Sequence, residues 1–368
     1  MEELPPELLD KIFDYSNFRV LCSYALTSKS SYHYFKDKKQ DIDYNIDKKG
    51  IGNLIKNGYS YIEYAINKTK YNNWYEGLKK ACEGGHLEMV EYMIKKGATY
   101  FGEGLTKACL NGHIKIVKYM IEKGANYWDI GLINACKGGH IEIVKMMIEK
   151  GANKWNQGLE WACEGGHLEI IQLMIEKGAY IWNYGLEGAC KGGHLNIVNY
   201  MIDKGANGWD FGLYGACLGG HLNIINYMIE KGANNWNWGL NGACNGGHLA
   251  IVNLMIDKGA NNWNRGLYWA CEGGHLEIVE YMIEKGANNW NEGLDEACRS
   301  GNIEIVKLMI EKGANNWNEG LFRACVHRHS KIAQLMIQYV GSLKNFWYDG
   351  KEHHDWLRHN GLIKTRYR

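Results

Sequence analysis

The sequence has almost no net charge and no long apolar run. Its 42 basic and 41 acidic residues leave a formal net charge of +1, so no overall field draws the chain toward nucleic acid or anionic lipid. No apolar stretch approaches the roughly 18–20 residues that cross a bilayer, and the first residues, MEELPPELLD, lack the apolar core of a secretory signal. We therefore expect neither a membrane protein nor a general binder of polyanions.

A single sequence unit recurs ten times between positions 72 and 341, with a period of 27 and without insertion or deletion. A strict period of roughly 20–50 residues indicates a solenoid, in which each unit buries its apolar face only against its neighbours. We predict an all-α solenoid of helix pairs, an architecture that argues against an enclosed active site. The period is marked by ten cysteines: Cys82, Cys109, Cys136, Cys163, Cys190, Cys217, Cys244, Cys271, Cys298 and Cys325.

Each unit contains two segments whose apolar residues have helical spacing. The first carries a leucine, an alanine and the cysteine, and the second reads HLEIVEYMIEKGA in one copy. A Gly-Gly turn separates them, and its second glycine, present in nine copies, predicts a left-handed backbone. The Asn or Asp that follows the repeat Trp in eight copies, as in Asn291, is predicted to cap the first helix. Only four or five residues join consecutive units, too few for a β-hairpin.

These motifs carry a resemblance to a known family. The segment GHLEIV followed by MIEKGA resembles the second helix of the ankyrin repeat, and GLxxAC lies where that family has Thr-Pro-Leu-His-x-Ala. The unit is shorter than the usual repeat of about 33 residues, and the loss falls in the loop that builds the family's β-hairpin finger. The resemblance implies protein binding through the helix face. Short repeats rich in Asn and Tyr resemble the ankyrin proteins of giant amoebal viruses.

Cysteine and histidine recur four residues apart, as in Cys82 and His86, a spacing that could offer two zinc ligands. However, the glycine turn separates them, Asn302 replaces one histidine, and zinc needs three or four ligands at about 2.0–2.3 Å. We predict no metal and no cofactor, with the cysteine buried as a small apolar residue and the histidine bonded to backbone donors of the second helix. Helix layers about 8–10 Å apart also prevent disulfides between equivalent cysteines. A reducing intracellular compartment is therefore expected.

An aromatic residue also recurs in every unit: Trp in nine copies and Phe101 in the tenth. Such rings could stack on nucleobases or could pack between units. The glycine three positions later, as in Gly293, is present in all ten copies although glycine near a helix start costs up to about 1 kcal/mol relative to alanine. We favour packing, with the indole of an adjacent repeat against this glycine.

The first helix of the unit varies between copies at four positions on one face. In the first copy these are Glu76, Lys79, Lys80 and Glu83, with the spacing i, i+3, i+4, i+7. We expect this variable face to be exposed and to select a ligand, because the scaffold leaves it free. Copies near the ends of the array fill it with charged residues.

Middle copies place large aromatic residues on the variable face, among Gly188, Gly215 and Gly242, which we expect to leave room for a large group. Exposed apolar patches with a charged rim mark interaction sites, and Trp and Tyr are frequent at binding hot spots. The alternative is that drift filled a solvated face. The predicted partner-binding residues are Trp161, Tyr184, Phe211, Tyr214, Trp238, Tyr268 and Trp269.

Residues 4–35 resemble an F-box, and both prolines of the chain lie there. That family binds the Skp-type linker of a cullin ubiquitin ligase, so the resemblance implies docking on this linker. The chain departs from the family pattern at Phe18, Val20 and Ser31, and the alternative is a helix pair that caps the solenoid. The expected docking residues are Leu4, Pro5, Leu8, Leu9, Ile12, Phe13 and Leu21.

The sequence thus predicts four segments. They are an F-box-like segment (1–40), a degenerate N-terminal capping repeat (41–71), ten ankyrin-like repeats (72–341) and a basic aromatic tail (342–368). No nucleophile–base pair, phosphate loop or paired carboxylate stands outside the repeat frame, so we expect no enzyme.

The predicted function follows from the two resemblances. We expect a monomeric adaptor that presents a host protein to a cullin-type ubiquitin ligase in the host cytoplasm. One alternative is a plain protein-binding scaffold or decoy without a link to ubiquitin. Another, single-stranded nucleic-acid binding on the aromatic face, would require a basic groove that the sequence does not indicate.

Overall fold

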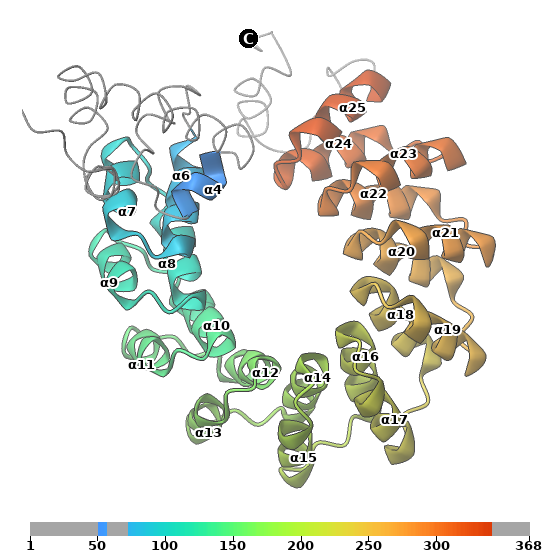
Figure 1. The fold of residues 1–368 in the computed structure, drawn as a ribbon, viewed down its shortest axis with the longest axis horizontal. Helices are drawn as coiled ribbons and strands as arrows, with labels where there is room; N and C mark the ends of the chain where they lie inside the picture. Colours follow the sequence, from blue (N-terminus) through green and yellow to red (C-terminus); the bar gives the residue numbers. More distant parts are fainter. Residues whose placement is uncertain (1–50, 57–72, 341–368) are drawn as a thin grey trace, which may run out of the picture. The chain divides into compact units, whose positions relative to one another are not determined.

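A computed structural model describes residues 51–56 and 73–340 of the chain, and all regular elements in these two ranges are α-helices (Figure 1). The chain divides into two compact units, residues 1–179 and 180–368. Within each unit the helices form pairs joined by a tight turn, and successive pairs stack on one another. This arrangement confirms the predicted all-α solenoid.

In each pair the first helix is called helix A and the second helix B. The first unit contains α4 (Ile51–Lys56) and the pairs α6 (Trp74–Gly84) with α7 (Leu87–Lys95), α8 (Phe101–Leu110) with α9 (Ile114–Glu122), α10 (Trp128–Gly138) with α11 (Ile141–Glu149), and α12 (Trp155–Gly165) with α13 (Leu168–Glu176).

The second unit contains six pairs. They are α14 (Trp182–Gly192) with α15 (Leu195–Asp203), α16 (Trp209–Gly219) with α17 (Leu222–Lys231), α18 (Trp236–Gly246) with α19 (Leu249–Asp257), α20 (Trp263–Gly273) with α21 (Leu276–Glu284), α22 (Trp290–Ser300) with α23 (Ile303–Lys312), and α24 (Trp317–Val326) with α25 (Ser330–Val340).

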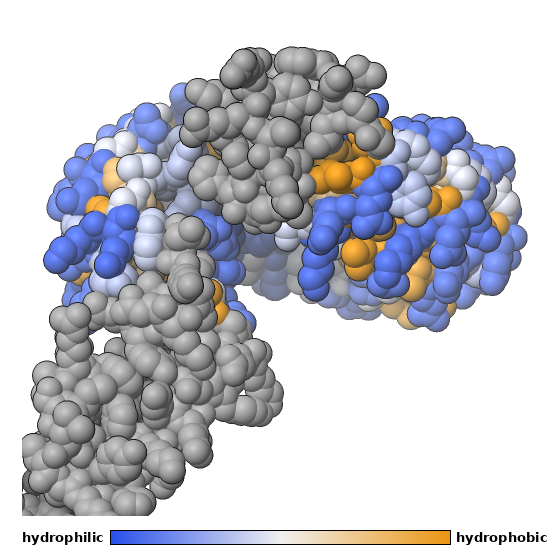
Figure 2. All heavy atoms as spheres, turned by 90° about the horizontal axis from the view of Figure 1, so that it is seen from above, coloured by the Kyte–Doolittle hydropathy of each residue, from blue (hydrophilic) through white to orange (hydrophobic). Residues whose placement is uncertain are grey.

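The core of both units repeats the same apolar positions in every copy. Helix A buries its leucine, alanine and cysteine, and helix B buries two aliphatic residues and a methionine, as the spacing predicts. Among the coloured residues in Figure 2, hydrophilic ones predominate, with hydrophobic residues in groups between them. The buried set of one repeat, all 0 % exposed, is Leu213, Ala216, Cys217, Ile224, Ile225 and Met228.

The turn between helices A and B has the predicted left-handed residue. The second glycine of the turn has a φ of 81° in Gly220 and 90° in Gly301. This left-handed conformation is unfavourable in free energy for residues that carry a Cβ atom. Arg328 holds this position in the last repeat with a φ of 65°, and it is the one non-glycine residue of positive φ within residues 51–56 and 73–340. A Cβ on Gly220 would also lie 2.5 Å from the His248 ring of the next repeat.

The loops between repeats are short, as predicted. Residues 96–100 join α7 to α8, and residues 232–235 join α17 to α18. Neither the described helices nor these loops contain a β-strand. The prediction that the Asn or Asp after the Trp caps helix A is wrong, because helix A begins at the Trp and its N-cap is the residue before it.

The Asn or Asp after the Trp instead connects neighbouring repeats. Oδ1 of Asn237 accepts hydrogen bonds from the backbone N–H groups of Asn261, at 2.9 Å, and Asn262, at 3.0 Å, in the next loop. A loop without a hairpin partner leaves its N–H groups free, and this side chain satisfies them. The same bond to the next loop is made by Asp129, Asn183, Asp210, Asn264 and Asn291.

The expected packing of an indole on the helix A glycine is also wrong. A Cβ on Gly293 would lie 2.6 Å from Sδ of Met309 in the same repeat and 3.4 Å from Sγ of Cys271 in the preceding one. The absence of a Cβ at Gly293 therefore leaves the space that the side chains of Met309 and Cys271 occupy. The half-buried Trp residues lie near the end of helix B, as in Trp236, whose Cδ1 would be 3.8 Å from a Cβ on Gly259.

The repeat histidine bonds to a backbone acceptor, not to the backbone donors we predicted. Nε2 of His140 lies 3.1 Å from the carbonyl oxygen of Leu110 in the preceding helix A, and since a carbonyl only accepts, Nε2 donates. Asn302, which replaces the histidine in one copy, also bonds the preceding repeat: its Nδ2 donates to the carbonyl of Gly274, 28 residues earlier, and its Oδ1 accepts from the N–H of Ile305. Equivalent bonds are made by His113, His167, His221, His275 and His329.

Candidate functional site: the variable face of the helices A

The thiols of the repeats have no sign of reactivity. All ten repeat cysteines are free and buried, and burial raises the pKa of the Cys217 thiol to about 12. A thiol that stays protonated is a poor nucleophile and a poor metal ligand. No group of three or more His, Cys, Asp or Glu side chains in the described part of the chain could hold a metal ion.

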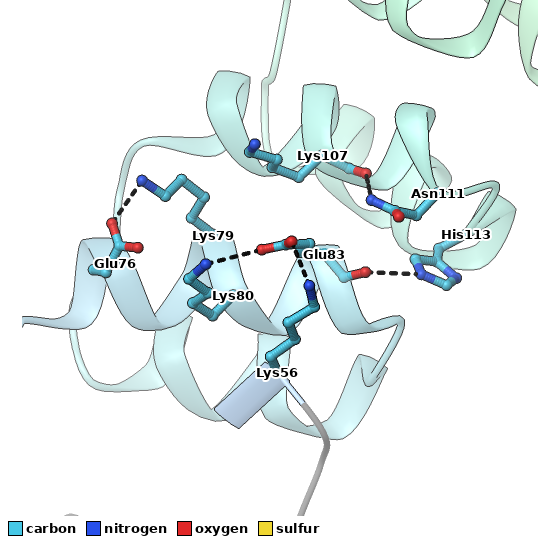
Figure 3. Close-up of polar contacts among 8 residues, drawn as sticks. All are labelled: Lys56, Glu76, Lys79, Lys80, Glu83, Lys107, Asn111 and His113. Atoms are coloured by element: carbon cyan, nitrogen blue, oxygen red, sulfur yellow. Dashed lines mark hydrogen bonds and ion pairs between the residues drawn. The ribbon is translucent and has the colours of Figure 1, made fainter. Parts of the chain in front are cut away.

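In the first unit the variable face carries charged residues that pair across repeats. Glu83 on α6 accepts from Lys56 on α4 at 2.6 Å and from Lys80 at 3.2 Å (Figure 3). Burial alone would raise the pKa of Glu83, but the hydrogen bonds from these two lysines lower it. Lys137 and Glu164, which lie one repeat apart, form the same kind of pair at 3.0 Å. These side chains therefore satisfy one another.

Trp161 is the one predicted binding residue in the first unit, on α12. Its ring is half-buried, and Nζ of Lys137 lies 4.2 Å from the ring centroid. Since Lys137 also pairs with Glu164, one face of Trp161 is already covered by a lysine of its own chain.

In the second unit five of the predicted residues form one cluster of rings, which we call the aromatic cluster. The centroids of Phe211 and Trp238 are 5.0 Å apart, those of Tyr214 and Trp269 are 6.3 Å apart, and Tyr268 lies 5.3 Å from Trp269. Tilted and edge-to-face arrangements at these distances are favourable aromatic contacts. Trp238 is 38 % exposed, whereas the other four rings are half-buried. The sequence did not predict this mutual packing.

Tyr184 precedes the cluster on α14 and is 39 % exposed. It occupies the frame position of Phe211 and Trp238, one and two repeats earlier. The role of Tyr184, of Trp161 and of the cluster in binding stays a prediction.

Glycines beside the cluster do not leave room for a ligand, contrary to our expectation. A Cβ on Gly242 would lie 2.5 Å from the carbonyl oxygen of Tyr214, and a Cβ on Gly215 would overlap the carbonyl oxygen of Glu187. The space beside these glycines is filled by the backbone of the preceding helix A. Gly215 and Gly242 therefore let α14, α16 and α18 approach closely, and Gly188 is likewise buried on α14.

Asn241 is a functional candidate that the sequence did not single out. It belongs to the variable face of α18, is 7 % exposed, and has no hydrogen-bond partner for its Oδ1. The N–H of Trp269 is buried without a partner as well. Asn241 is the one amide at its position in the ten copies, between Tyr214 in the preceding copy and Tyr268 in the following one. Comparing the copies position by position could have revealed it.

The far end of the variable face is rich in paired charges. Arg299 lies 2.6 Å from Glu272 and 2.5 Å from Glu296. Burial, together with the nearby Glu319, raises the pKa of Asp295 to about 7, and Asn316 donates to that carboxyl at 2.5 Å. The surface at this end of the second unit is therefore polar, and its charged groups largely neutralise one another.

The expected docking residues between Leu4 and Leu21 lie outside the described residues. No described helix combines the length and the apolar composition that spanning a bilayer requires.

Comparisons with known proteins identify both kinds of module. Ankyrin repeats match residues 50–130, 128–184, 216–293 and 240–319, and an F-box domain matches residues 1–42. Both are typically non-catalytic interaction modules. The crystal structure of the human ASB11 ankyrin repeat domain is similar at 21 % identity over 50 % of this chain and 97 % of that chain, with a TM-score of 0.29. No curated protein matches the chain. Because the repeat matches span more than half of its length, the chain belongs to the ankyrin repeat family.

Proposed function

We propose that the protein is a substrate adaptor, which presents a protein to a cullin-type ubiquitin ligase. The observation that carries this proposal is the combination of an F-box domain with an aromatic cluster on the variable face of one repeat array. The F-box binds a Skp-type linker, and the repeats bind the protein to be modified. The adaptor needs no catalytic group and no cofactor of its own, and it acts as a monomer.

The F-box end of the proposal rests on residues 1–42. The apolar side chains assigned to the linker follow the pattern of that family and alternate with charged residues, as in Glu7, Asp10 and Lys11. Apolar side chains in such a pattern can be buried in a groove of a partner. The residues that bind the linker are Leu4, Pro5, Leu8, Leu9, Ile12, Phe13 and Leu21.

The repeat end of the proposal rests on the variable face. Large aromatic side chains supply contact area at low entropic cost, and those that are partly exposed gain most when a partner covers them. Tyr184 extends this surface beyond the aromatic cluster within the second unit, and Trp161 is a separate contact residue of the first unit.

The compartment and the source are part of the proposal. Ten buried free thiols are typical of a reducing compartment such as the cytoplasm. The short repeats rich in Asn and Tyr support a giant amoebal virus as the source and a host protein as the partner.

Affinity purification of three versions of the full chain tests the proposal. The wild type is expected to co-purify with a Skp-type linker and with a partner protein. The double variant Leu8→Asp/Ile12→Asp should lose the linker and keep the partner. The triple variant Phe211→Ala/Trp238→Ala/Trp269→Ala should lose the partner, keep the linker and retain its helical circular dichroism.

A plain scaffold or decoy without a ubiquitin link is the second candidate. It is favoured by Phe18, Val20 and Ser31, where the F-box family prefers other residues. If the wild type captures its partner and no linker, the scaffold is correct and the adaptor is excluded.

A further inference from the structure

Asn241 lies at the centre of the aromatic cluster by its place in the repeat frame. Tyr214 and Tyr268 are one repeat before it and one repeat after it, so they hold the same position on the two adjoining helices A. Trp238 precedes it by three residues on α18, a spacing that places both side chains on one helical face. The rings of Tyr214 and Trp238 are 6.3 Å apart. Aromatic residues therefore flank Asn241 in the repeat frame, on its own helix and on both adjoining helices A.

The amide oxygen of Asn241 and the indole N–H of Trp269 are unused hydrogen-bonding groups. Both atoms are buried without a partner, although most buried polar atoms in proteins are satisfied. The only other polar residue buried to this degree in the described part of the chain is Glu296, at 8 %, and it bonds to Arg299. One acceptor and one donor thus lie within the cluster, each in need of a complementary group.

Carboxylates adjoin the cluster on two sides. Burial raises the pKa of the Tyr214 hydroxyl, and the negative charges of Glu187 and Glu272 raise it further. Glu187 occupies the frame position of Tyr214 one repeat earlier, on α14, and Glu272 lies one turn beyond Tyr268 on α20. A cation held on the rings would therefore be attracted by the carboxylate of Glu187 on α14, whereas Glu272 already pairs with Arg299.

The cluster already binds a guanidinium group of its own chain. Cζ of Arg265 lies 4.3 Å from the ring centroid of Tyr268 and 5.2 Å from that of Trp269. These are distances of a favourable cation–π contact. This contact shows which cation the rings accommodate, and it covers the α20 end of the cluster while Trp238 remains exposed at the α18 end.

We propose that the aromatic cluster binds an arginine-containing segment of the partner protein. The guanidinium stacks on Trp238 and donates to Oδ1 of Asn241, and a backbone carbonyl of the segment accepts from the indole N–H of Trp269. Trp238, the most exposed ring of the cluster, rotates to give access to the amide. This inference rests on the proposed function and specifies the chemistry of the bound segment.

Arginine fits these groups better than lysine. Its planar guanidinium stacks on a ring and presents five N–H donors in fixed directions, whereas the ammonium of lysine is a strongly hydrated point charge. Aromatic side chains near one amide oxygen suit a planar donor such as guanidinium, which can stack on a ring and donate a hydrogen bond to the oxygen.

Peptide selection on the full-length protein tests the proposal. A displayed library of random short peptides is selected on the wild type, and the binders that the triple alanine variant fails to retain are sequenced and measured. They are expected to be enriched in arginine. Replacing that arginine by lysine, or by the neutral isostere citrulline, should weaken binding at least about tenfold.

Asn241→Leu separates binding from folding. It removes an unsatisfied buried acceptor, so the variant should have a higher Tm than the wild type, yet bind the arginine peptides at least about tenfold more weakly. The matched control is Asn226→Leu on the exposed surface of α17, which should leave peptide binding unchanged.

Three results would overturn the arginine assignment. They are ring-dependent peptides without arginine, equal affinity for the citrulline peptides, and unchanged binding by Asn241→Leu. In each case the aromatic face still binds peptides and the adaptor proposal stands. If no selected peptide depends on the rings, the proposals of an arginine site and of a partner-binding face are both refuted. Co-purification of the linker still tests the F-box proposal independently.

Discussion

The Nδ2 of Asn302 donates a 2.9 Å hydrogen bond to the carbonyl oxygen of Gly274, in the position where other repeats use a histidine. An amide and an imidazole thus perform similar functions, since each donates to a carbonyl at the C-terminal end of the preceding helix A: the histidines to a residue of the last turn, Asn302 to the C-cap Gly274. Helix ends buried without such partners are costly. The repeat histidines that make this bond therefore stabilise the stacking of repeats.

Substitution of one repeat histidine tests this role. His221→Leu leaves the carbonyl of Lys191 without its donor and should lower the free energy of unfolding by about 1–3 kcal/mol. His221→Asn should lower it by less, because the amide of Asn302 replaces the imidazole in its own repeat. Urea denaturation followed by circular dichroism measures both, and equal losses in the two variants would contradict the assignment.

The left-handed residue of the turn gives a second prediction, with opposite signs at two positions. Arg328→Gly should raise the free energy of unfolding by up to about 1 kcal/mol, because it removes a side chain from a backbone of positive φ. Gly220→Ala should lower it by more than this, since the new Cβ also meets the His248 ring. A stabilising Gly220→Ala variant would be inconsistent with both causes.

The side chain of Asn237 gives a third prediction. Asn237→Ala removes the acceptor for the N–H groups of Asn261 and Asn262 and should cost about 0.5–1.5 kcal/mol, a modest loss because water reaches these groups. Asn237→Asp keeps the oxygen, as Asp210 does in the preceding repeat. Hydrogen exchange at the two amides should accelerate in the alanine variant and not in the aspartate variant. Unchanged exchange in both would exclude the bond.

The buried carboxyl of Asp295 predicts a dependence of stability on pH. Its folded pKa of about 7 is above the ordinary value of 3.8, so between these values the folded chain retains a proton that the unfolded chain releases. Stability contributed by this group therefore falls as pH rises from about 4 to about 7. Asp295→Asn should stabilise the protein at pH 8 by about 1 kcal/mol, a value discounted for solvent screening, and have little effect at pH 4. An equal effect at both pH values would refute this.

Most features set within one repeat could be predicted from the sequence, although the start of helix A and the contact of Met309 with Gly293 could not. Leucine, alanine and cysteine spacing defined helix A, the glycine frame defined the left-handed turn at Gly220, and the short loops ruled out hairpins. These depend on local backbone preferences and on one buried stripe, which ten copies specify repeatedly.

Contacts between repeats could not be predicted in the same way. The partner of His140 is a carbonyl 30 residues earlier, and that of Asn237 is a loop 24 residues later. Both intervals depend on the rotation and rise between units, which the length of the repeat does not fix. The glycines at 215 and 242 were misjudged for the same reason, since the backbone of the preceding helix fills the space beside them.

The uniform spacing of these contacts has a consequence for how the array can change. Six repeat histidines reach back 30 residues, and six Asn or Asp side chains reach forward 24 or 25. Excising or duplicating one whole repeat unit among these copies therefore leaves such a donor with an acceptor of the same kind at the new junction. Copy number is thus free to vary by recombination, and a lineage could lengthen or shorten the array, or shift its aromatic copies, without redesigning a single interface.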